Sequence, residues 1–144
     1  MSQEADPTIA DASPSDTLLA LEGDPKARLV DVRTQAEWSY VGVANLSATP
    51  AGEPVLLEWQ SFPSMQVSEA FGAALQAAVP DRSAPLYFLC RSGVRSLAAA
   101  KAATALGYEA CYNVKDGFEG PPDTEGHRGN RAGWKASGLP WRQS

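Results

Sequence analysis

The sequence is poor in cysteine, histidine and basic residues, and it has no long apolar run. Two cysteines in 144 residues do not make a disulfide scaffold, and the single histidine, His127, gives no pattern of metal ligands. The net charge of −5 argues against binding to nucleic-acid phosphates. No stretch approaches the roughly 20 apolar residues that span a bilayer. These shortages exclude secreted disulfide scaffolds, membrane-spanning proteins and basic nucleic-acid binders.

Length and composition predict one globular domain. A chain of 144 residues can form one sizeable core, and its hydrophobic (44%) and charged (20%) fractions are close to ordinary usage. Residues 1–12 are polar and acidic, so we expect a flexible tail followed by a single domain over residues 13–144. The N-terminus lacks the apolar run of a signal peptide, which favours a cytoplasmic location.

Apolar patterns predict strands that alternate with helices. Short apolar runs predict strands over residues 28–32, 43–46, 85–89 and 108–114, and residues 55–59 fit a strand or a helical turn. Helices are expected over residues 14–23, 34–42, 68–78 and 94–106. This order is typical of an α/β, three-layer domain with a central, mostly parallel sheet of about five strands and helices on both faces.

The helix expected over residues 94–106 is rich in alanine, which allows it to approach the sheet closely. Its spacing predicts a buried face made of Val94, Leu97, Ala98, Ala102, Ala105 and Leu106. Gly107 is well placed to end it.

The most informative segment is Cys90-Arg91-Ser92-Gly93-Val94-Arg95. It follows an apolar strand and leads into a helix, so backbone N–H groups and the positive end of the helix dipole point at the sulfur. Two arginines add positive charge. This setting favours the thiolate, the reactive form of cysteine. In open parallel sheets, ligand sites lie beyond the carboxyl ends of the strands, where Cys90 is expected.

With several other segments, this loop resembles the rhodanese-like domain of the single-domain thiosulfate sulfurtransferase type. The matching segments are Leu29-Val30-Asp31-Val32-Arg33, Glu37-Trp38 with Gly42, Phe88 to Ser96, Asn113-Val114 with Gly117-Phe118, and Gly133-Trp134-Lys135 with Gly138-Leu139-Pro140-Trp141. The resemblance covers about residues 13–142, and the Cys-x-x-Gly-x-Arg loop is its most specific part.

The resemblance implies a sulfurtransferase that moves a sulfane sulfur from thiosulfate or a persulfide donor to a thiol or protein acceptor. Cys90 is the implied nucleophile and carries the sulfur as a persulfide, so no cofactor is implied. The amides of the active-site loop are expected to stabilise the terminal sulfur; the loop residues are Arg91, Ser92, Gly93, Val94 and Arg95. We expect the protein to act as a monomer.

The charged residues near the loop have different expected roles. Arg91 is expected to guide an anionic donor, whereas Arg95 is expected to brace the loop by hydrogen bonds. Asp31 and Arg33 are expected to form structural hydrogen bonds and ion pairs at the end of their strand. The spacing of Arg33 and Glu37 also predicts an ion pair across one helical turn.

Loop length separates sulfur transfer from its main chemical alternative. Cys90 and Arg95 enclose four residues, whereas cysteine phosphatases of related fold use Cys-x5-Arg, a loop wide enough for phosphate. The shorter loop favours a single sulfur atom. A small phosphatase or arsenate reductase, and a catalytically weak binding or sensory module, remain as alternatives. Cys111 is expected to pack in a strand, and His127 is expected to lie in a surface loop.

The chain departs from the family pattern at two places. Family members commonly carry Gly-His-Ile-Pro-Gly-Ala where this chain has Gly42-Val43-Ala44-Asn45-Leu46, which leaves the route of residues 43–66 open. The usual Gly-Gly pair before the aromatic residue is Asp116-Gly117 here, so one bulkier residue is expected near the mouth of the cleft.

Overall fold

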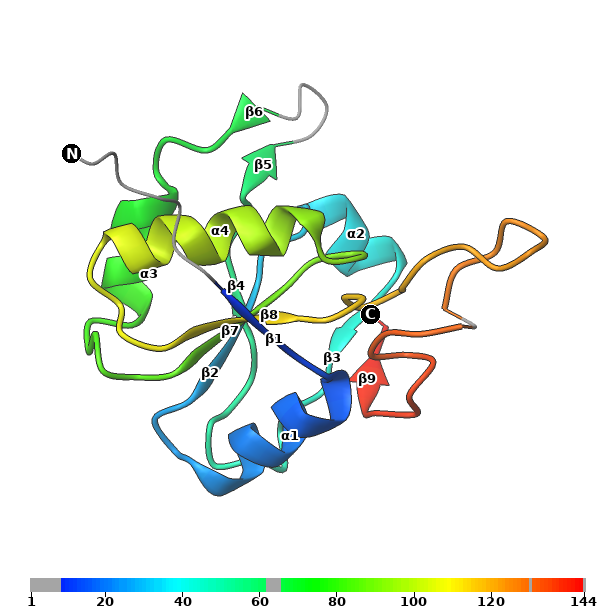
Figure 1. Cartoon of the computed structure of the whole chain (residues 1–144), viewed down its shortest axis with the longest axis horizontal. Helices are drawn as coiled ribbons and strands as arrows, with labels where there is room; N and C mark the ends of the chain where they lie inside the picture. The colour runs from blue at the N-terminus through cyan, green and yellow to red at the C-terminus, as the bar shows by residue number, and fades with distance from the viewer. Residues whose placement is uncertain (1–8, 62–65, 130, 144) are drawn as a thin grey trace.

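A parallel sheet of five strands runs through the middle of the molecule (Figure 1). The computed structural model describes residues 9–61, 66–129 and 131–143. The strands lie in the order β1 (Ala10–Ala12), β8 (Cys111–Val114), β7 (Leu86–Leu89), β2 (Arg28–Asp31) and β4 (Val55–Leu56). No helix within these described ranges is long and apolar enough to cross a membrane.

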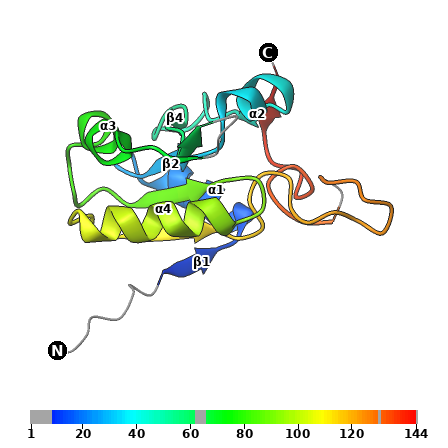
Figure 2. The same ribbon diagram turned by 90° about the horizontal axis from the view of Figure 1, so that it is seen from above.

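Helices cover both faces of this sheet, which confirms the predicted three-layer α/β arrangement (Figures 1 and 2). The helices are α1 (Pro14–Gly23), α2 (Gln35–Tyr40), α3 (Phe71–Ala78) and α4 (Val94–Ala105). Successive strand residues enter opposite cores. Val30 and Phe88 belong to the core cluster under α3 and α4, whereas Leu29 and Leu89 belong to the cluster that contains Leu21 of α1. A strand buried on both faces needs this continuous apolar run.

Side-chain caps fix the starts of α1 and α2. Ser13 Oγ accepts a hydrogen bond from the Asp16 amide at 3.0 Å, and Pro14 occupies the first position of the helix. Thr34 and Glu37 form a capping box, in which each side chain accepts from the other's backbone N–H. This box holds the Glu37 carboxylate just beyond the carboxyl end of β2.

The predicted start of the domain at residue 13 is wrong, because Ala10–Ala12 form β1 and pair in parallel with β8. Residues 1–8 of the predicted tail lie outside the described residues. The strand β8 is also shorter than the predicted 108–114. Tyr108 is buried before the strand begins, and its hydroxyl donates to the Val79 carbonyl oxygen at 2.5 Å.

In the segment left open by the sequence, residues 43–66, β4 is the part of the described residues (43–61 and 66) that enters the central sheet. β3 (Val43–Ala44) pairs instead with β9 (Trp141–Arg142) in a separate antiparallel sheet. β5 (Gln60–Ser61) and β6 (Gln66–Val67) form a third small sheet. The run at 43–46 therefore supports the C-terminal segment rather than the central sheet, and residues 55–59 contribute a two-residue strand and no helix.

The predicted buried face of α4 is wrong. The residues that α4 buries are Ser96, Ala99, Ala100 and Ala103, whereas Val94 is 77% exposed. The prediction used the spacing of apolar residues alone, which put Val94 and Leu97 on the buried face of the helix. The helix instead turns a polar residue, Ser96, toward the core, because that side chain has hydrogen-bond partners there. The alanines allow the close approach to the sheet that the sequence predicts.

The C-terminal segment is part of the core. Trp134 is fully buried in the cluster on the α1 face, and its Nε1–H donates to the Pro140 carbonyl oxygen at 2.8 Å. Its backbone N–H donates to the Gly117 carbonyl oxygen at 2.8 Å. Figure 2 shows this segment at one end of the sheet, beyond the first turn of α4, with the orange loop projecting from the body. The segment thus covers the end of the sheet where Cys90 lies.

Replacing Trp134 by Ala should lower the free energy of unfolding by about 3–5 kcal/mol, because it removes a fully buried indole and leaves a cavity. Urea unfolding followed by circular dichroism measures the loss. Trp141→Ala is the matched control, since that indole is 38% exposed and should cost less than half as much. Equal losses in the two variants would show that Trp134 is not a core residue.

Candidate active site

The loop Cys90–Arg95 connects the carboxyl end of β7 to the start of α4. Leu89 is the last residue of β7, and Val94 is the first residue of α4. Gly93 lies between them with φ of +115°, a left-handed conformation that side chains other than glycine's rarely allow. This turn folds the loop back over the Cys90 side chain, which is 1% exposed.

Among the described residues, two groups lie within hydrogen-bond distance of the Cys90 sulfur. The Gly93 N–H donates to Sγ at 3.1 Å, so one loop amide is aimed at the sulfur. Ser96 Oγ lies 3.2 Å from Sγ. The Ser96 hydroxyl in turn donates to Asn113 Oδ1 at 2.5 Å. Ser96 and Asn113 were not among the predicted site residues, although both lie in segments that were noted as family matches.

The segment after β8 holds the loop by its backbone. The Phe118 amide donates to the Cys90 carbonyl oxygen at 2.8 Å, and the amides of Glu119 and Gly120 donate to that of Arg91 at 3.0 and 3.1 Å. Gly117 makes the approach possible, since a Cβ there would overlap the Cys90 carbonyl oxygen and lie 2.6 Å from Arg91 carbonyl atoms. These contacts were not predicted, although Gly117-Phe118 was noted as a family match.

Asp116, which replaces a glycine of the family pattern, adopts φ of +65°. Aspartate tolerates this left-handed conformation better than most residues do, so the turn does not require a glycine at position 116. Asp116 therefore provides the left-handed turn into Gly117 without a glycine at position 116.

Arg95 forms an ion pair with Glu37, which lies in the first turn of α2. Its two terminal nitrogens donate to the two carboxylate oxygens at 2.6 and 2.9 Å. Burial opposes ionisation of Glu37, but the hydrogen bonds from Arg95 and the Thr34 amide, with the charges of Arg95 and Arg33, hold its pKa below the ordinary 4.5. The hydrogen bonds to Glu37 outweigh burial and raise the pKa of Arg95. Arg95 thus ties the loop to α2.

The predicted ion pair between Arg33 and Glu37 is wrong, because Arg33 faces Asp31 instead. Arg33 Nη2 lies 2.7 Å from Asp31 Oδ2 and also donates to the Gly42 carbonyl oxygen at 2.7 Å. Both side chains are fully buried. The guanidinium lies over the Phe118 ring at 4.3 Å. The pair therefore joins the end of β2 to the segment that holds the loop.

The outer side of the loop is exposed and carries positive charge. The Arg91 side chain is exposed next to Cys90, and Val94 is exposed beside it. A further cation, Lys135, lies over two rings of the neighbouring segments: its ammonium group is 4.1 Å from the centre of the Trp141 ring and 5.9 Å from that of Phe118. Lys135 was not a predicted site residue, although it lies in a segment that was noted as a family match.

Cys111 lies away from the Cys90 loop, and His127 lies on the surface. Cys111 begins β8 at the opposite end of that strand, and burial raises the pKa of its thiol. His127 is exposed in the loop that follows Gly120. Within the described residues, no three His, Cys, Asp or Glu side chains are grouped so that they could hold a metal ion.

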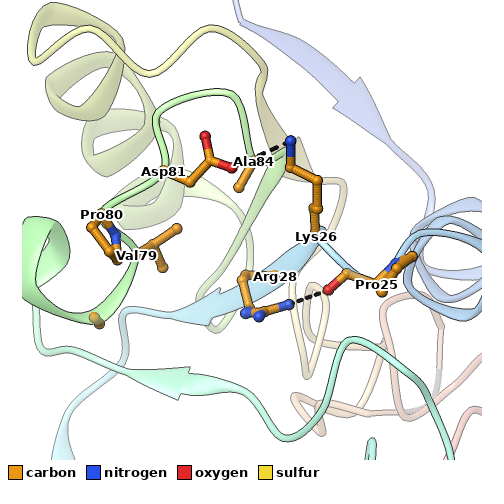
Figure 3. Close-up of a pocket in the computed structure, with 8 residues that line it drawn as sticks. Pro25, Lys26, Arg28, Val79, Pro80, Asp81 and Ala84 are labelled. Atoms are coloured by element: carbon orange, nitrogen blue, oxygen red, sulfur yellow. Dashed lines mark hydrogen bonds and ion pairs between the residues drawn. The ribbon is translucent and has the colours of Figure 1, made fainter.

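A cavity of about 160 Å³ lies at the other end of the sheet, where β2 and β7 begin (Figure 3). Lys26 and Asp81 pair across it at 3.2 Å, and Arg28 donates to the Pro25 carbonyl oxygen. Hydrogen bonds from Ser83 and Lys26 lower the pKa of Asp81 to about 2. The charged side chains that line the cavity therefore already have hydrogen-bond or ion-pair partners. The cavity lies at the opposite end of β7 from Cys90.

The ion pair between Arg95 and Glu37 predicts a contribution to stability that depends on pH. A carboxylate with a lowered pKa in the folded state stabilises the fold above its unfolded value and loses that effect as the pH falls through its folded value. Glu37→Gln should therefore lower the free energy of unfolding by about 1–2 kcal/mol at pH 7 and by much less at pH 3.5. Urea titrations at both pH values measure this. The exposed Glu22→Gln control should show no such difference, and a Glu37→Gln effect that grows toward low pH would contradict the assignment.

The sequence is similar to a known domain family and to curated bacterial proteins. Residues 14–120 match the model of the rhodanese-like domain. Among curated sequences, uncharacterized protein RC0915 of Rickettsia conorii is 38% identical over 123 residues, which are 85% of this chain and 88% of the relative. Uncharacterized protein RP600 of Rickettsia prowazekii is 38% identical over 117 residues, 81% of this chain and 83% of the relative.

Solved structures share the fold. Rv0390 from M. tuberculosis superposes with a TM-score of 0.85 at 46% identity, over 95% of this chain and all of that one. The polysulfide-sulfur transferase of Wolinella succinogenes, a homodimer, gives 0.64 at 20% identity, over 94% of this chain and 80% of that one. A protein from Rhodopseudomonas palustris described as a possible tyrosine phosphatase gives 0.60 at 17% identity, over 99% of both chains. The last two likenesses concern the fold alone.

Proposed function

The chain belongs to the rhodanese-like domain family, and from this we propose that it is a sulfurtransferase in which Cys90 carries sulfur as a persulfide. The observation that carries the proposal is the six-residue loop from Cys90 to Arg95. It follows a buried strand, opens a helix and directs the Gly93 N–H at the cysteine sulfur.

The proposed reaction has two steps. The Cys90 thiolate attacks the outer sulfur of thiosulfate, a bond forms between the two sulfurs, and the thiosulfate S–S bond breaks, so that sulfite leaves with the electron pair. The thiol proton goes to solvent. A thiophilic acceptor then attacks the outer sulfur of the persulfide and regenerates the Cys90 thiolate. The reaction needs no cofactor, and the acceptor is a small thiol, a protein thiol or, in an assay, cyanide.

The hydrogen-bond partner of Arg95 favours sulfur transfer over phosphate chemistry. An arginine that closes a phosphate-binding loop must give its N–H groups to the phosphate oxygens. In this chain both terminal nitrogens of Arg95 already donate to Glu37. The loop is also one residue shorter than the Cys-x5-Arg loop of the phosphatases. Both features support a site for a single sulfur atom.

Arg91 is the side chain placed to attract an anionic donor. It is exposed, it follows Cys90 directly, and its backbone is fixed by the amides of Glu119 and Gly120. A fixed backbone with an exposed charged side chain suits a role in donor capture rather than in support of the loop. We propose that the substrates are small anionic sulfur donors, and that the protein acts as a monomer in the cytoplasm.

One observation favours a second candidate, a binding module without turnover. The Cys90 side chain is 1% exposed, so a donor reaches the sulfur only if the loop or the C-terminal segment moves. A module of this kind would keep the loop as a structural element and would not form a persulfide at a useful rate.

Intact-mass measurement distinguishes the two candidates. After incubation with thiosulfate and removal of the donor, the wild type should gain the mass of one sulfur atom, about 32 Da, which cyanide then removes. Cys90→Ser should gain nothing, and Cys111→Ser should gain the same mass as the wild type. No gain in the wild type with thiosulfate or with a small persulfide would reject the sulfurtransferase and leave the binding module.

The two arginines should respond differently to replacement. Arg91→Ala should raise the KM for thiosulfate about tenfold with little change in thermal stability, because it removes an exposed charge that meets the donor. Arg95→Ala should lower the melting temperature, since it leaves the half-buried Glu37 carboxylate without its cation. Arg91→Lys keeps the charge and is the control. The reverse pattern, with stability lost in Arg91→Ala and KM changed in Arg95→Ala alone, would contradict the assignment.

A further inference from the structure

Asn113 of β8 links the active-site loop to the first strand of the sheet. Its side-chain nitrogen donates to the Gly93 carbonyl oxygen at 3.2 Å and to Asp11 Oδ1 at 3.3 Å. Its side-chain oxygen accepts from the Ser96 hydroxyl at 2.5 Å. The residue is 6% exposed, so these contacts are made inside the protein. Asn113 therefore touches β1, the loop and α4 at once.

The direction of the Asn113 amide follows from these neighbours. The Gly93 carbonyl and the Asp11 carboxylate are acceptors, so the group that faces both of them must be the nitrogen. Because both of its N–H groups are given to these oxygens, Asn113 has no donor left for a substrate. Any effect of Asn113 on the reaction must therefore pass through the loop.

Gly93 is the residue through which such an effect passes. Its N–H donates to Cys90 Sγ at 3.1 Å, whereas its carbonyl is the group that Asn113 holds. These two groups lie on successive peptide units, which meet at Gly93 with φ of +115° and ψ of −5°. Glycine adopts many other combinations of φ and ψ, so the residue does not fix this turn by itself. A carbonyl held on one side of the turn restrains the direction of the N–H on the other.

The loop is thus held at two places. The backbone bonds from the segment after β8 hold the carbonyls of Cys90 and Arg91 at its start. The Asn113 side chain holds the carbonyl of Gly93 at its end, directly before α4. The second contact is the one that acts on the residue whose N–H faces the sulfur.

β1 keeps Asn113 in this position. Asp11 is the register partner of Asn113 in the parallel pair of β1 and β8, so their side chains lie side by side on one face of the sheet. The pair continues in the backbone, where the Lys115 N–H donates to the Ala12 carbonyl oxygen at 2.8 Å. β1 precedes the residues that match the family model, 14–120, yet it reaches the active-site loop through one side chain.

We propose that Asn113 is a positioning residue for sulfur transfer: it fixes the Gly93 carbonyl so that the Gly93 N–H stays directed at the Cys90 sulfur, and Asp11 of β1 keeps Asn113 in place. This role deepens the proposed function and rests on it. An N–H that is already aimed needs no reorganisation when the new sulfur–sulfur bond forms. Asn113 therefore acts on the chemical step, whereas Arg91 acts on the capture of the donor.

Single-turnover persulfide formation separates these two effects. Each variant is mixed with increasing thiosulfate and quenched at set times, and the gain in mass gives a limiting rate and a half-saturating concentration. Asn113→Ala should lower the limiting rate about tenfold, because one hydrogen bond that orients the loop is lost. The half-saturating concentration should change less than about twofold, since Arg91 is untouched. A change in the half-saturating concentration alone would overturn the proposal.

Amide exchange tests the geometry without any turnover. In a chain with isotope-labelled glycine, NMR follows the Gly93 amide as it exchanges with deuterated water in the absence of a donor. This amide should exchange about tenfold faster in Asn113→Ala than in the wild type. Ser96→Ala removes the contact on the other side of the Asn113 amide and should leave the Gly93 exchange rate within about twofold. An unchanged rate in Asn113→Ala, or an equal acceleration in Ser96→Ala, contradicts the assignment.

Tyr112→Ala is the matched control for a general loss of stability. Tyr112 precedes Asn113 in β8, faces the other side of the sheet, and stacks on the Tyr87 ring with 4.8 Å between the ring centres. This variant should lower the melting temperature and leave both the limiting rate and the Gly93 exchange rate unchanged. If it alters both as much as Asn113→Ala does, Asn113 is only a structural residue and the proposal is overturned.

Asp11 is exposed, so its variants carry little risk to folding. Asp11→Ala should change both readouts about two- to threefold, because it removes one of the two partners of the Asn113 nitrogen. Asp11→Asn keeps an oxygen toward Asn113 and should restore most of the loss. An Asp11→Ala chain identical to the wild type would overturn the role of β1. A wild type that forms no persulfide would reject the proposed function, and the Gly93 exchange rate would still decide the role of Asn113, so the two failures are distinguishable.

Discussion

The backbone hydrogen bonds between the Cys90 loop and the segment after β8 are the constraint on which the site depends. The carbonyls of Cys90 and Arg91 accept from three successive amides, those of Phe118, Glu119 and Gly120. With its carbonyls held there, the loop turns at Gly93 and aims that amide at Sγ. The same segment carries Phe118, whose ring lies against the Arg33 guanidinium. One short stretch of chain thus fixes the loop, covers the buried ion pair and anchors the C-terminal segment.

The sequence predicted the features that local chemistry determines. Ser13 and Thr34 are caps with their own short-range signals, and the buried strands β2 and β7 are continuous apolar runs. The motif around Cys90 indicated the nucleophile because strand, loop and helix start follow one another directly. The resemblance to a family then supplied the expected chemistry.

Partners that are distant in sequence were beyond such reasoning. Glu37 lies one helical turn from Arg33 and pairs instead with Arg95, which is 58 residues away. The buried face of α4 was misplaced because apolarity ranks Val94 above Ser96, whereas the fold gives Ser96 two polar partners. Likewise, β1 is three residues of a polar segment, and only the edge of β8 makes it a strand. In each case a tertiary contact outweighs the local signal.

The central claim is that the outer sulfur of a donor passes through Cys90. Thiosulfate labelled isotopically at the outer or at the inner sulfur tests it most directly, by asking which label reaches the protein and then thiocyanate after cyanide is added. The account predicts that the outer label alone binds, in no more than one equivalent per chain. It also predicts that the bound label is lost in Cys90→Ser. Retention of the inner label, or release of labelled thiocyanate without a protein-bound intermediate, would contradict it.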